Sequence, residues 1–205
     1  MNKKGFFILF EGPDRSGKST QVNLLSDYLK KKNVNVIVTR EPGGTLVGED
    51  IRNILLNPNN KISPLCEVLL YEAARAQHVQ EKIKPALEND YVVICDRFTL
   101  ATEAYQGYGR GIDINIVKIL NNIATGGLKP DLIICLTISD EEYKKRRRSQ
   151  TDRMESESDD FRIRVNNAYF KIFSELKEAL IIDSSKTIEE IHSIIVKEVE
   201  CRLKI

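Results

Sequence analysis

The stretch that most constrains this chain spans residues 11–20 and reads Glu-Gly-Pro-Asp-Arg-Ser-Gly-Lys-Ser-Thr. Gly12, Gly17, Lys18 and Ser19 fit G-x-x-x-x-G-K-[ST], the pattern of a phosphate-binding loop. The glycines let the backbone bring its N–H groups close to phosphate oxygens, and the next helix N-terminus favours the same anion. In this pattern the lysine reaches the β- and γ-phosphates and the serine hydroxyl binds Mg²⁺. The predicted nucleotide-phosphate site is Gly12, Pro13, Asp14, Arg15, Ser16, Gly17, Lys18, Ser19 and Thr20.

The segments on either side of this loop supply the context that the motif needs. Phe6–Phe10 is a short apolar run of the kind found in buried strands. In the segment from Gln21 to Lys32, Val22, Leu25 and Leu29 recur at helical spacing. A strand, the loop and a helix in that order favour a phosphate site over a glycine-rich turn that binds nothing.

Similar apolar runs recur along the chain, separated by segments long enough to form helices. Continuous runs are typical of parallel strands that are covered on both faces. We therefore expect an α/β fold of three layers, α/β/α, with a five-stranded parallel sheet and a mobile lid. Ligands of such sheets bind beyond the carboxyl ends of the strands. The predicted strands are Phe6–Phe10, Val34–Val38, Tyr91–Cys95, Leu132–Leu136 and Leu180–Ile182.

Length and charge narrow the class of protein. We expect one domain over residues 1–205. The 31 Lys and Arg residues nearly balance the 30 Asp and Glu residues, whereas a protein that coats nucleic acid has a strong basic excess. No run approaches the ~20 apolar residues of a membrane span. The four cysteines show no C-x-x-C pair, so buried, reduced thiols in a cytoplasmic protein are expected rather than disulfides or a metal site.

Charged residues follow two of the predicted strands. Arg40 and Glu41 come after the second strand. Taken alone, they indicate a functional site and a surface turn with an ion pair equally well. Asp96 and Arg97 end the third strand, where a carboxylate typically organises Mg²⁺ and an arginine suits a second phosphate. The next residues, 102–111, are either a flexible loop or a polar small-molecule site, which their Thr, Tyr and Gln side chains favour.

Two further segments carry candidate functional residues. Ser63 and Pro64 begin a predicted long helix to about residue 88, in which Tyr71 and Arg75 share a face and His78 is expected at the surface or an interface. A basic run at residues 144–148 leads into polar residues, which suits a phosphate-closing lid over about residues 146–160.

Several of these segments together resemble the thymidylate kinase family of bacterial length. They occur in the family's order and cover about residues 6 to 185. The segments are Phe-Glu-Gly-Pro-Asp-Arg-Ser-Gly-Lys-Ser-Thr, Thr-Arg-Glu-Pro-Gly-Gly-Thr, Leu-Leu-Tyr-Glu-Ala-Ala-Arg, Asp-Arg-Phe, Ala-Tyr-Gln-Gly and Thr-Asp-Arg-Met-Glu. The resemblance implies Mg²⁺-dependent phosphoryl transfer from ATP to dTMP. It also implies a homodimer whose subunits contact each other through helices, including the one that bears Tyr71.

The resemblance also implies roles for the residues that bind the nucleoside of dTMP. Tyr71 would stack on thymine and Arg75 would donate to a thymine carbonyl. Thr102 and Gln106 would read the base edge. Tyr105 would crowd the ribose 2′ position and so favour deoxyribose.

The remaining implied roles concern phosphate, metal and catalysis. Asp14 would accept from the 3′-hydroxyl, and Arg52 and Arg97 would hold the dTMP phosphate. Glu41 and Asp96, with Ser19, would organise Mg²⁺, and Glu41 is also implied as a substrate-binding residue. The family places a catalytic arginine either in the phosphate-binding loop or in the lid, whereas this chain has Arg15 and Arg153, which we expect to be partly redundant. Phe98 stands where the family often has Tyr or His. The implied catalytic set is Lys18, Arg15, Arg153, Asp96 and Arg97.

Three other functions stay open from the sequence. The chain could be a related kinase that acts on dUMP or a deoxynucleoside, although Arg52 and Arg97 favour a monophosphate. It could be a regulatory ATP-binding module, although such a module has no use for a base pocket. Nucleic-acid binding through residues 144–148 conflicts with the near-zero net charge.

Overall fold

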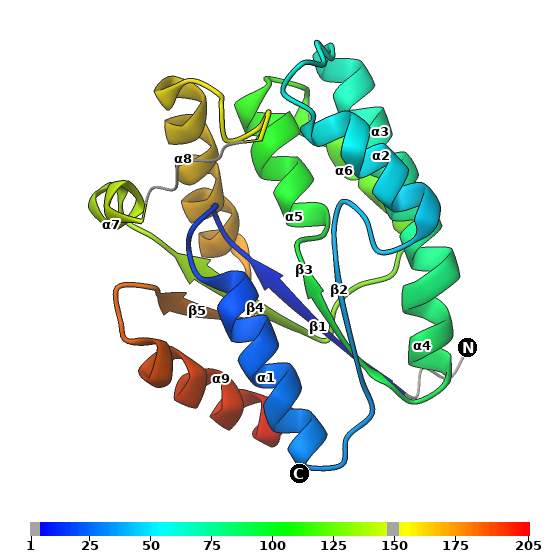
Figure 1. Cartoon of the computed structure of the whole chain (residues 1–205), viewed down its shortest axis with the longest axis vertical. Coiled ribbons are helices and arrows are strands. Elements are labelled where there is room, and N and C mark those ends of the chain that lie inside the picture. The colour runs from blue at the N-terminus through cyan, green and yellow to red at the C-terminus, as the bar shows by residue number, and fades with distance from the viewer. Residues whose placement is uncertain (1–4, 147–151) are drawn as a thin grey trace.

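The computed structural model describes residues 5–146 and 152–205. A five-stranded sheet with strand order β2-β3-β1-β4-β5 lies between helices on its two faces (Figure 1). Every neighbouring pair of strands is parallel, so the predicted three-layer α/β fold is confirmed. The strands are β1 (Phe6–Glu11), β2 (Val36–Arg40), β3 (Val92–Asp96), β4 (Leu132–Thr137) and β5 (Ala179–Asp183).

Helices connect the strands and extend beyond the sheet. The helix predicted from Ser63 to about residue 88 is confirmed as one continuous stretch, with Ser63 as its N-cap and a π-helical segment, η1, inside it. No helix in the described ranges is both long and apolar enough to cross a membrane. The helices are α1 (Lys18–Lys31), α2 (Leu46–Leu56), α3 (Pro64–His78), η1 (Val79–Ile83), α4 (Lys84–Glu88), α5 (Thr99–Thr102), η2 (Glu103–Gly109), α6 (Ile114–Thr125), α7 (Asp140–Lys145), α8 (Asp159–Glu175) and α9 (Ile188–Leu203).

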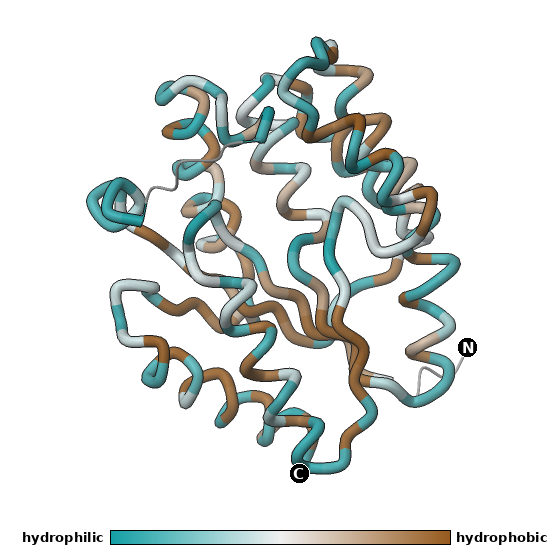
Figure 2. The backbone as a smooth tube through the Cα atoms, viewed as in Figure 1, coloured by the Kyte–Doolittle hydropathy of each residue, from teal (hydrophilic) through white to brown (hydrophobic). Residues whose placement is uncertain are grey.

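The core has one apolar layer on each face of the sheet. Successive side chains of β1 point to opposite faces, so Ile8 and Phe10 pack on one side with α1 and α9. Phe7 and Leu9 pack on the other side with η1 and α4. Both layers are fully buried, which explains why the strands are continuously apolar in the sequence and in the central strands of Figure 2.

The chain leaves β1 and β3 toward opposite faces of the sheet, although the two strands are neighbours. β1 leads into α1, which packs in the layer containing Ile8. β3 leads into α5 and η2, and η2 packs with α8 on the opposite face. The loops after these strands therefore border a crevice at the point where ligands bind in such sheets.

Candidate active site

Two glycines give the phosphate-binding loop a backbone that other residues cannot adopt at low cost. Gly12 has φ 145° and Gly17 has φ 91°, both in the region that favours glycine. A Cβ on Gly12 would also collide with the carbonyl oxygen of Leu136. The loop therefore keeps its shape only with glycine at these positions, and α1 begins directly after Gly17.

Lys18 lies buried against the loop that it follows. Its Nζ donates to the carbonyl oxygens of Gly12 at 2.9 Å and Pro13 at 2.8 Å. Burial, and then the nearby charge of Arg97, lowers the pKa of Lys18 to about 8. An anion at this position would stabilise the charged ammonium.

A large open cavity lies above the loop. It has a volume of about 1630 Å³, part of it open to solvent, and is lined by the loop residues Asp14 to Thr20 together with strand-end and lid-side residues. Arg146 belongs to this cavity and was missed by the sequence analysis. Its Nη1 donates to the carbonyl oxygen of Arg15 at 3.2 Å and its Nη2 donates to that of Ser184 at 2.6 Å. The only sequence signal for Arg146 was its place in the basic run.

Ser19 and Asp96 fit a magnesium site. Ser19 Oγ donates to Asp96 Oδ2 at 2.9 Å, and Asp96 Oδ1 is buried without a hydrogen-bond partner. A hydroxyl beside a free carboxylate oxygen suits Mg²⁺, which takes few protein ligands and completes its shell with waters and substrate phosphates. Consistently, no cluster of three or more His, Cys, Asp or Glu residues in the described ranges could hold a metal by itself.

Glu41 is engaged inside the protein. Its Oε2 accepts from Arg75 Nε at 2.7 Å, and its Oε1 lies 2.9 Å from His78 Nδ1. Both carboxylate oxygens thus have protein partners, and a role for Glu41 in metal binding stays a prediction that this arrangement does not support.

The prediction that His78 lies at the surface or an interface is wrong. Its side chain is fully buried, with Nε2 2.6 Å from Thr39 Oγ1 and Nδ1 facing Glu41. Gly44, at φ 85°, makes room for the ring, because a Cβ there would lie 2.6 Å from it. Polar partners on both ring nitrogens satisfy the imidazole inside the core.

Arg75 is held by a saturated set of partners. Nε donates to Glu41, Nη1 donates to Glu72 at 2.5 Å and Asn121 at 2.7 Å, and Nη2 donates to Phe98 O and Thr102 Oγ1, both at 2.9 Å. A guanidinium has five N–H groups, so every donor is engaged. Burial alone would lower the pKa of Arg75, but the two carboxylates raise it. Its predicted bond to a thymine carbonyl stays a prediction and would require one N–H to be shared.

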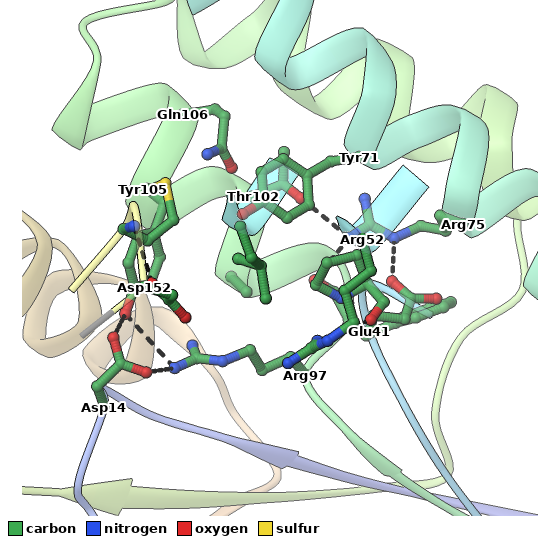
Figure 3. A pocket seen from close by; sticks show the side chains of 15 residues that line it. Asp14, Glu41, Arg52, Tyr71, Arg75, Arg97, Thr102, Tyr105, Gln106 and Asp152 are labelled. Atoms are coloured by element: carbon green, nitrogen blue, oxygen red, sulfur yellow. Dashed lines mark hydrogen bonds and ion pairs between the residues drawn. The ribbon is translucent and has the colours of Figure 1, made fainter. Parts of the chain in front are cut away.

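Arg97 joins the phosphate-binding loop to a second pocket. Its backbone has φ 72°, and its side chain donates to Gly12 O at 3.2 Å, Tyr169 OH at 2.9 Å and the Asp14 carboxylate. Tyr105 OH donates to the other oxygen of that carboxylate at 2.7 Å. Figure 3 shows Asp14, Arg97 and Tyr105 at one side of the pocket.

The second pocket lies beside the first cavity and has a volume of about 600 Å³, part of it open to solvent. Its wall brings together every residue that was predicted to bind the acceptor, from four separate segments of the chain (Figure 3). Those residues are Asp14, Glu41, Arg52, Tyr71, Arg75, Arg97, Thr102, Tyr105 and Gln106. The wall also contains residues that the sequence did not single out for this site: Pro42, Leu56, Phe98, Ala101, Asp152 and Met154. Residues 102–109 are helical here, so the polar-site alternative fits and the flexible-loop alternative does not.

The two predicted catalytic arginines lie in different surroundings. Arg15 lines the large cavity, stacks 4.3 Å from the ring centre of Tyr143 and pairs with Glu155 at 3.3 Å. Arg153 is buried, and it donates to Leu55 O and pairs with Glu67, each at 2.6 Å. Arg153 does not line the large cavity, so its catalytic role and its redundancy with Arg15 stay predictions without support here. Part of the predicted lid, residues 147–151, lies outside the described residues.

The fold and these two joined cavities define a class of protein, the P-loop phosphotransferases that act on small phosphorylated acceptors. A family model described as thymidylate kinase matches residues 10–195. A thymidylate kinase of Thermoanaerobacter sp. (strain X514) is 47% identical over 199 residues, which cover 96% of this chain and 98% of the relative. One of Caldanaerobacter subterraneus subsp. tengcongensis is 46% identical over 203 residues, covering 98% of each chain.

A solved structure agrees with these sequence matches. The thymidylate kinase of Ehrlichia chaffeensis has a TM-score of 0.78 and 35% sequence identity, covering 96% of this chain and 98% of that chain. The chain belongs to the thymidylate kinase family, whose members are nucleoside monophosphate kinases that form dTDP from dTMP and ATP.

The saturated surroundings of Arg75 predict a large loss of stability when it is removed. Arg75→Ala leaves the buried carboxylates of Glu41 and Glu72 uncompensated and should lower the free energy of unfolding by about 3–5 kcal/mol. Arg202→Ala is the control, because it breaks an ion pair with Glu198 on the surface of α9 and should cost less than about 1 kcal/mol. Urea denaturation measures both, and equal small losses would contradict the structural role of Arg75.

Proposed function

We propose that this chain transfers the γ-phosphoryl group of ATP to dTMP across the two joined cavities, giving dTDP and ADP. The observation that carries the proposal is that Asp14, Glu41, Arg52 and Arg97 line both cavities. A ligand phosphate in the acceptor pocket and a ligand phosphate above the loop would therefore meet at these side chains.

The residues support transfer without a general base. The attacking atom is a 5′-phosphate oxygen of dTMP, which already carries negative charge. It forms a bond to the γ-phosphorus while the bond from that phosphorus to the ADP oxygen breaks. Lys18, Arg15 and Arg97 line the large cavity, which supports a role in holding the phosphates in line and neutralising the charge that spreads over them. Arg52 also lines both cavities, and its Nη1 donates to Pro42 O at 2.8 Å.

Ser19 and Asp96 are the residues that would hold Mg²⁺. When bound there, the ion would supply positive charge that neutralises charge developing on the phosphates. The buried, unpartnered Oδ1 of Asp96 supports the assignment. Glu41 is left out, because both its oxygens have protein partners.

The acceptor pocket suits a deoxynucleotide with an amide-bearing base. Tyr71 presents an aromatic ring in the wall, as expected for stacking on thymine (Figure 3). Thr102 and Gln106 supply polar atoms near it. Tyr105 and Asp14 are joined by a hydrogen bond at the phosphate end, which supports roles beside the ribose.

We also propose that residues 146–160 act as a lid and that the chain forms a homodimer in the cytoplasm. Exposed apolar side chains gather on α3 and α6, and a second copy of this chain would cover them. Light scattering should then give twice the chain mass. All four cysteines are free, which supports a reducing compartment. Cys95 and Cys135 are buried as expected, whereas the expectation of burial is wrong for Cys66 and Cys201, which are exposed. The exposed side chains are Leu65, Leu69, Ile116, Ile119 and Ile123.

A coupled ADP-release assay tests the proposed reaction. We expect ATP turnover with Mg²⁺ to be fastest with dTMP, slower with dUMP by the ~10–200-fold that one methyl group can supply, and negligible with thymidine. A chelator should abolish turnover and added Mg²⁺ should restore it. Equal rates with dTMP, dUMP and dCMP would remove the base assignments, and no dependence on an acceptor would remove the kinase assignment.

Because Arg15 and Arg153 lie in different surroundings, we expect their alanine variants to show different defects. Arg15→Ala should lower kcat by about 10²–10³-fold, since it removes a charge from the cavity in which the transferring phosphate would lie. Arg153→Ala should lower the free energy of unfolding by about 1–3 kcal/mol and leave kcat close to the parent value.

The double variant decides between separate and redundant roles for these arginines. Separate roles predict that the double variant loses no more kcat than Arg15→Ala alone. If removing Arg153 lowers kcat strongly only when Arg15 is also absent, the two arginines substitute for one another in catalysis.

A further inference from the structure

Glu67 is a buried carboxylate behind the acceptor pocket that has no assigned role. It lies in the first turn of α3 and is fully buried. Its Oε1 accepts from Gln106 Nε2 at 2.8 Å and from Arg110 Nε at 3.0 Å. Its Oε2 lies 2.9 Å from Arg110 Nη2 and 2.6 Å from Arg153 Nη1. Every lone-pair direction of this side chain thus faces a donor.

These donors keep Glu67 ionised. Burial alone would raise the pKa of the carboxyl, but the hydrogen bonds from Arg110 and Gln106, with the charge of Arg110, outweigh it and lower the pKa. An ionised carboxylate accepts hydrogen bonds and donates none. The group that faces Glu67 at this point must therefore be an N–H.

That requirement fixes the orientation of the Gln106 carboxamide. Its NH₂ group is committed to Glu67, so its oxygen faces the other way, on the side of Tyr71 and the pocket (Figure 3). The residues that the structure describes give Gln106 Oε1 no hydrogen-bond donor. With only 1% of its surface exposed, the Gln106 side chain keeps its place, so the bond to Glu67 decides which end of the carboxamide faces the pocket.

We propose that Glu67 is a positioning residue: it orients Gln106 so that a hydrogen-bond acceptor, Gln106 Oε1, faces the base. The pocket thereby selects bases with an N–H in the ring. Thymine carries a hydrogen on N3, which can donate to Gln106 Oε1. Cytosine carries a lone pair on N3, which would face that oxygen with no hydrogen between them. This inference rests on the proposed function, because it assigns the base selectivity of the same pocket.

The competing explanation is that Glu67 serves only to hold cations. Arg110 also pairs with Glu157 at 2.6 Å, and Arg153 lies within the segment that was predicted as a lid. Loss of Glu67 would then weaken the fold without changing which base is accepted. The ratio of kcat/KM for two bases separates the explanations, since a purely structural defect lowers both values together.

The test compares dTMP with 5-methyl-dCMP, which keeps the methyl group and lacks the N3 hydrogen. We expect the parent enzyme to prefer dTMP by at least about 10³-fold. In Glu67→Gln, the carbonyl oxygen stays with Arg110 Nη2 and Arg153, and the new NH₂ group replaces Oε1. The NH₂ group loses the bond from Arg110 Nε and faces Gln106, so Gln106 turns its own NH₂ toward the pocket. The preference should then fall at least tenfold, with kcat/KM for dTMP reduced.

Two variants serve as controls. Arg110→Gln removes an ion-pair partner and leaves the bond from Gln106 to Glu67, so thermal stability should fall and the base preference should not change. Gln106→Leu removes the oriented amide, so the preference should collapse, and adding Glu67→Gln to it should cause no further change. If Glu67→Gln alone does not fold, the pair Glu67→Gln with Arg110→Gln carries the same expected loss of preference.

The outcomes are distinguishable from failure of the proposed function. An unchanged base preference in folded Glu67→Gln, or an equal change in Arg110→Gln, would overturn the role of Glu67 while dTMP turnover persists. A parent enzyme that does not phosphorylate dTMP would overturn the proposed function itself.

Discussion

The joined cavities depend on the contacts of Arg97. This residue lies where β3 ends beside β1, and its backbone N–H donates to Phe10 O at 2.9 Å, so the pairing of the two strands continues into the site. Its left-handed backbone costs on the order of 1–3 kcal/mol and persists because neighbouring contacts fix it. From this position the guanidinium reaches both the loop carbonyl of Gly12 and the Asp14 carboxylate.

The polar residues around Arg97 are built to be rigid. Arg75 has no free N–H group, and Glu67 accepts from Gln106, Arg110 and Arg153 while it is buried. Buried ion pairs of this kind add little net stability, because desolvation offsets their attraction, but breaking one side is costly. Their consequence here is a fixed pattern of donors and acceptors around the pocket, and such preorganisation supports both positioning of phosphates and selection of a base.

Much of the fold and part of the site could be predicted from the sequence, because they rest on local signals. The loop motif fixed the place of Lys18, and continuous apolar runs gave the strands. The family resemblance brought Tyr71 and Gln106 into one expected site, and both line the pocket. The burial of His78 was not predictable, since it depends on space beside Gly44 and on partners 37 and 39 residues away.

The contacts of Arg153 and Glu67 were equally hidden in the sequence. They lie 86 positions apart by their residue numbers, and no periodic pattern joins them. The sequence showed that Glu67 and Arg153 are charged. Only the packing of α3 against η2 and the segment after α7 determined that they pair with each other. Residue type thus predicted the chemistry of the site better than it predicted which side chains contact one another.

Simultaneous occupation of the two cavities is the most direct measure of this account. Calorimetric titration would use one ligand in which adenosine and thymidine are joined through their 5′ oxygens by a chain of five phosphates. If the cavities are joined, this ligand should bind at one site per chain, with an affinity at least about 10²-fold above that of either ATP or dTMP alone. It should also displace bound ATP and bound dTMP at the same time. Binding no tighter than ATP, with dTMP still able to bind beside it, would contradict the claim that the cavities form one reaction space.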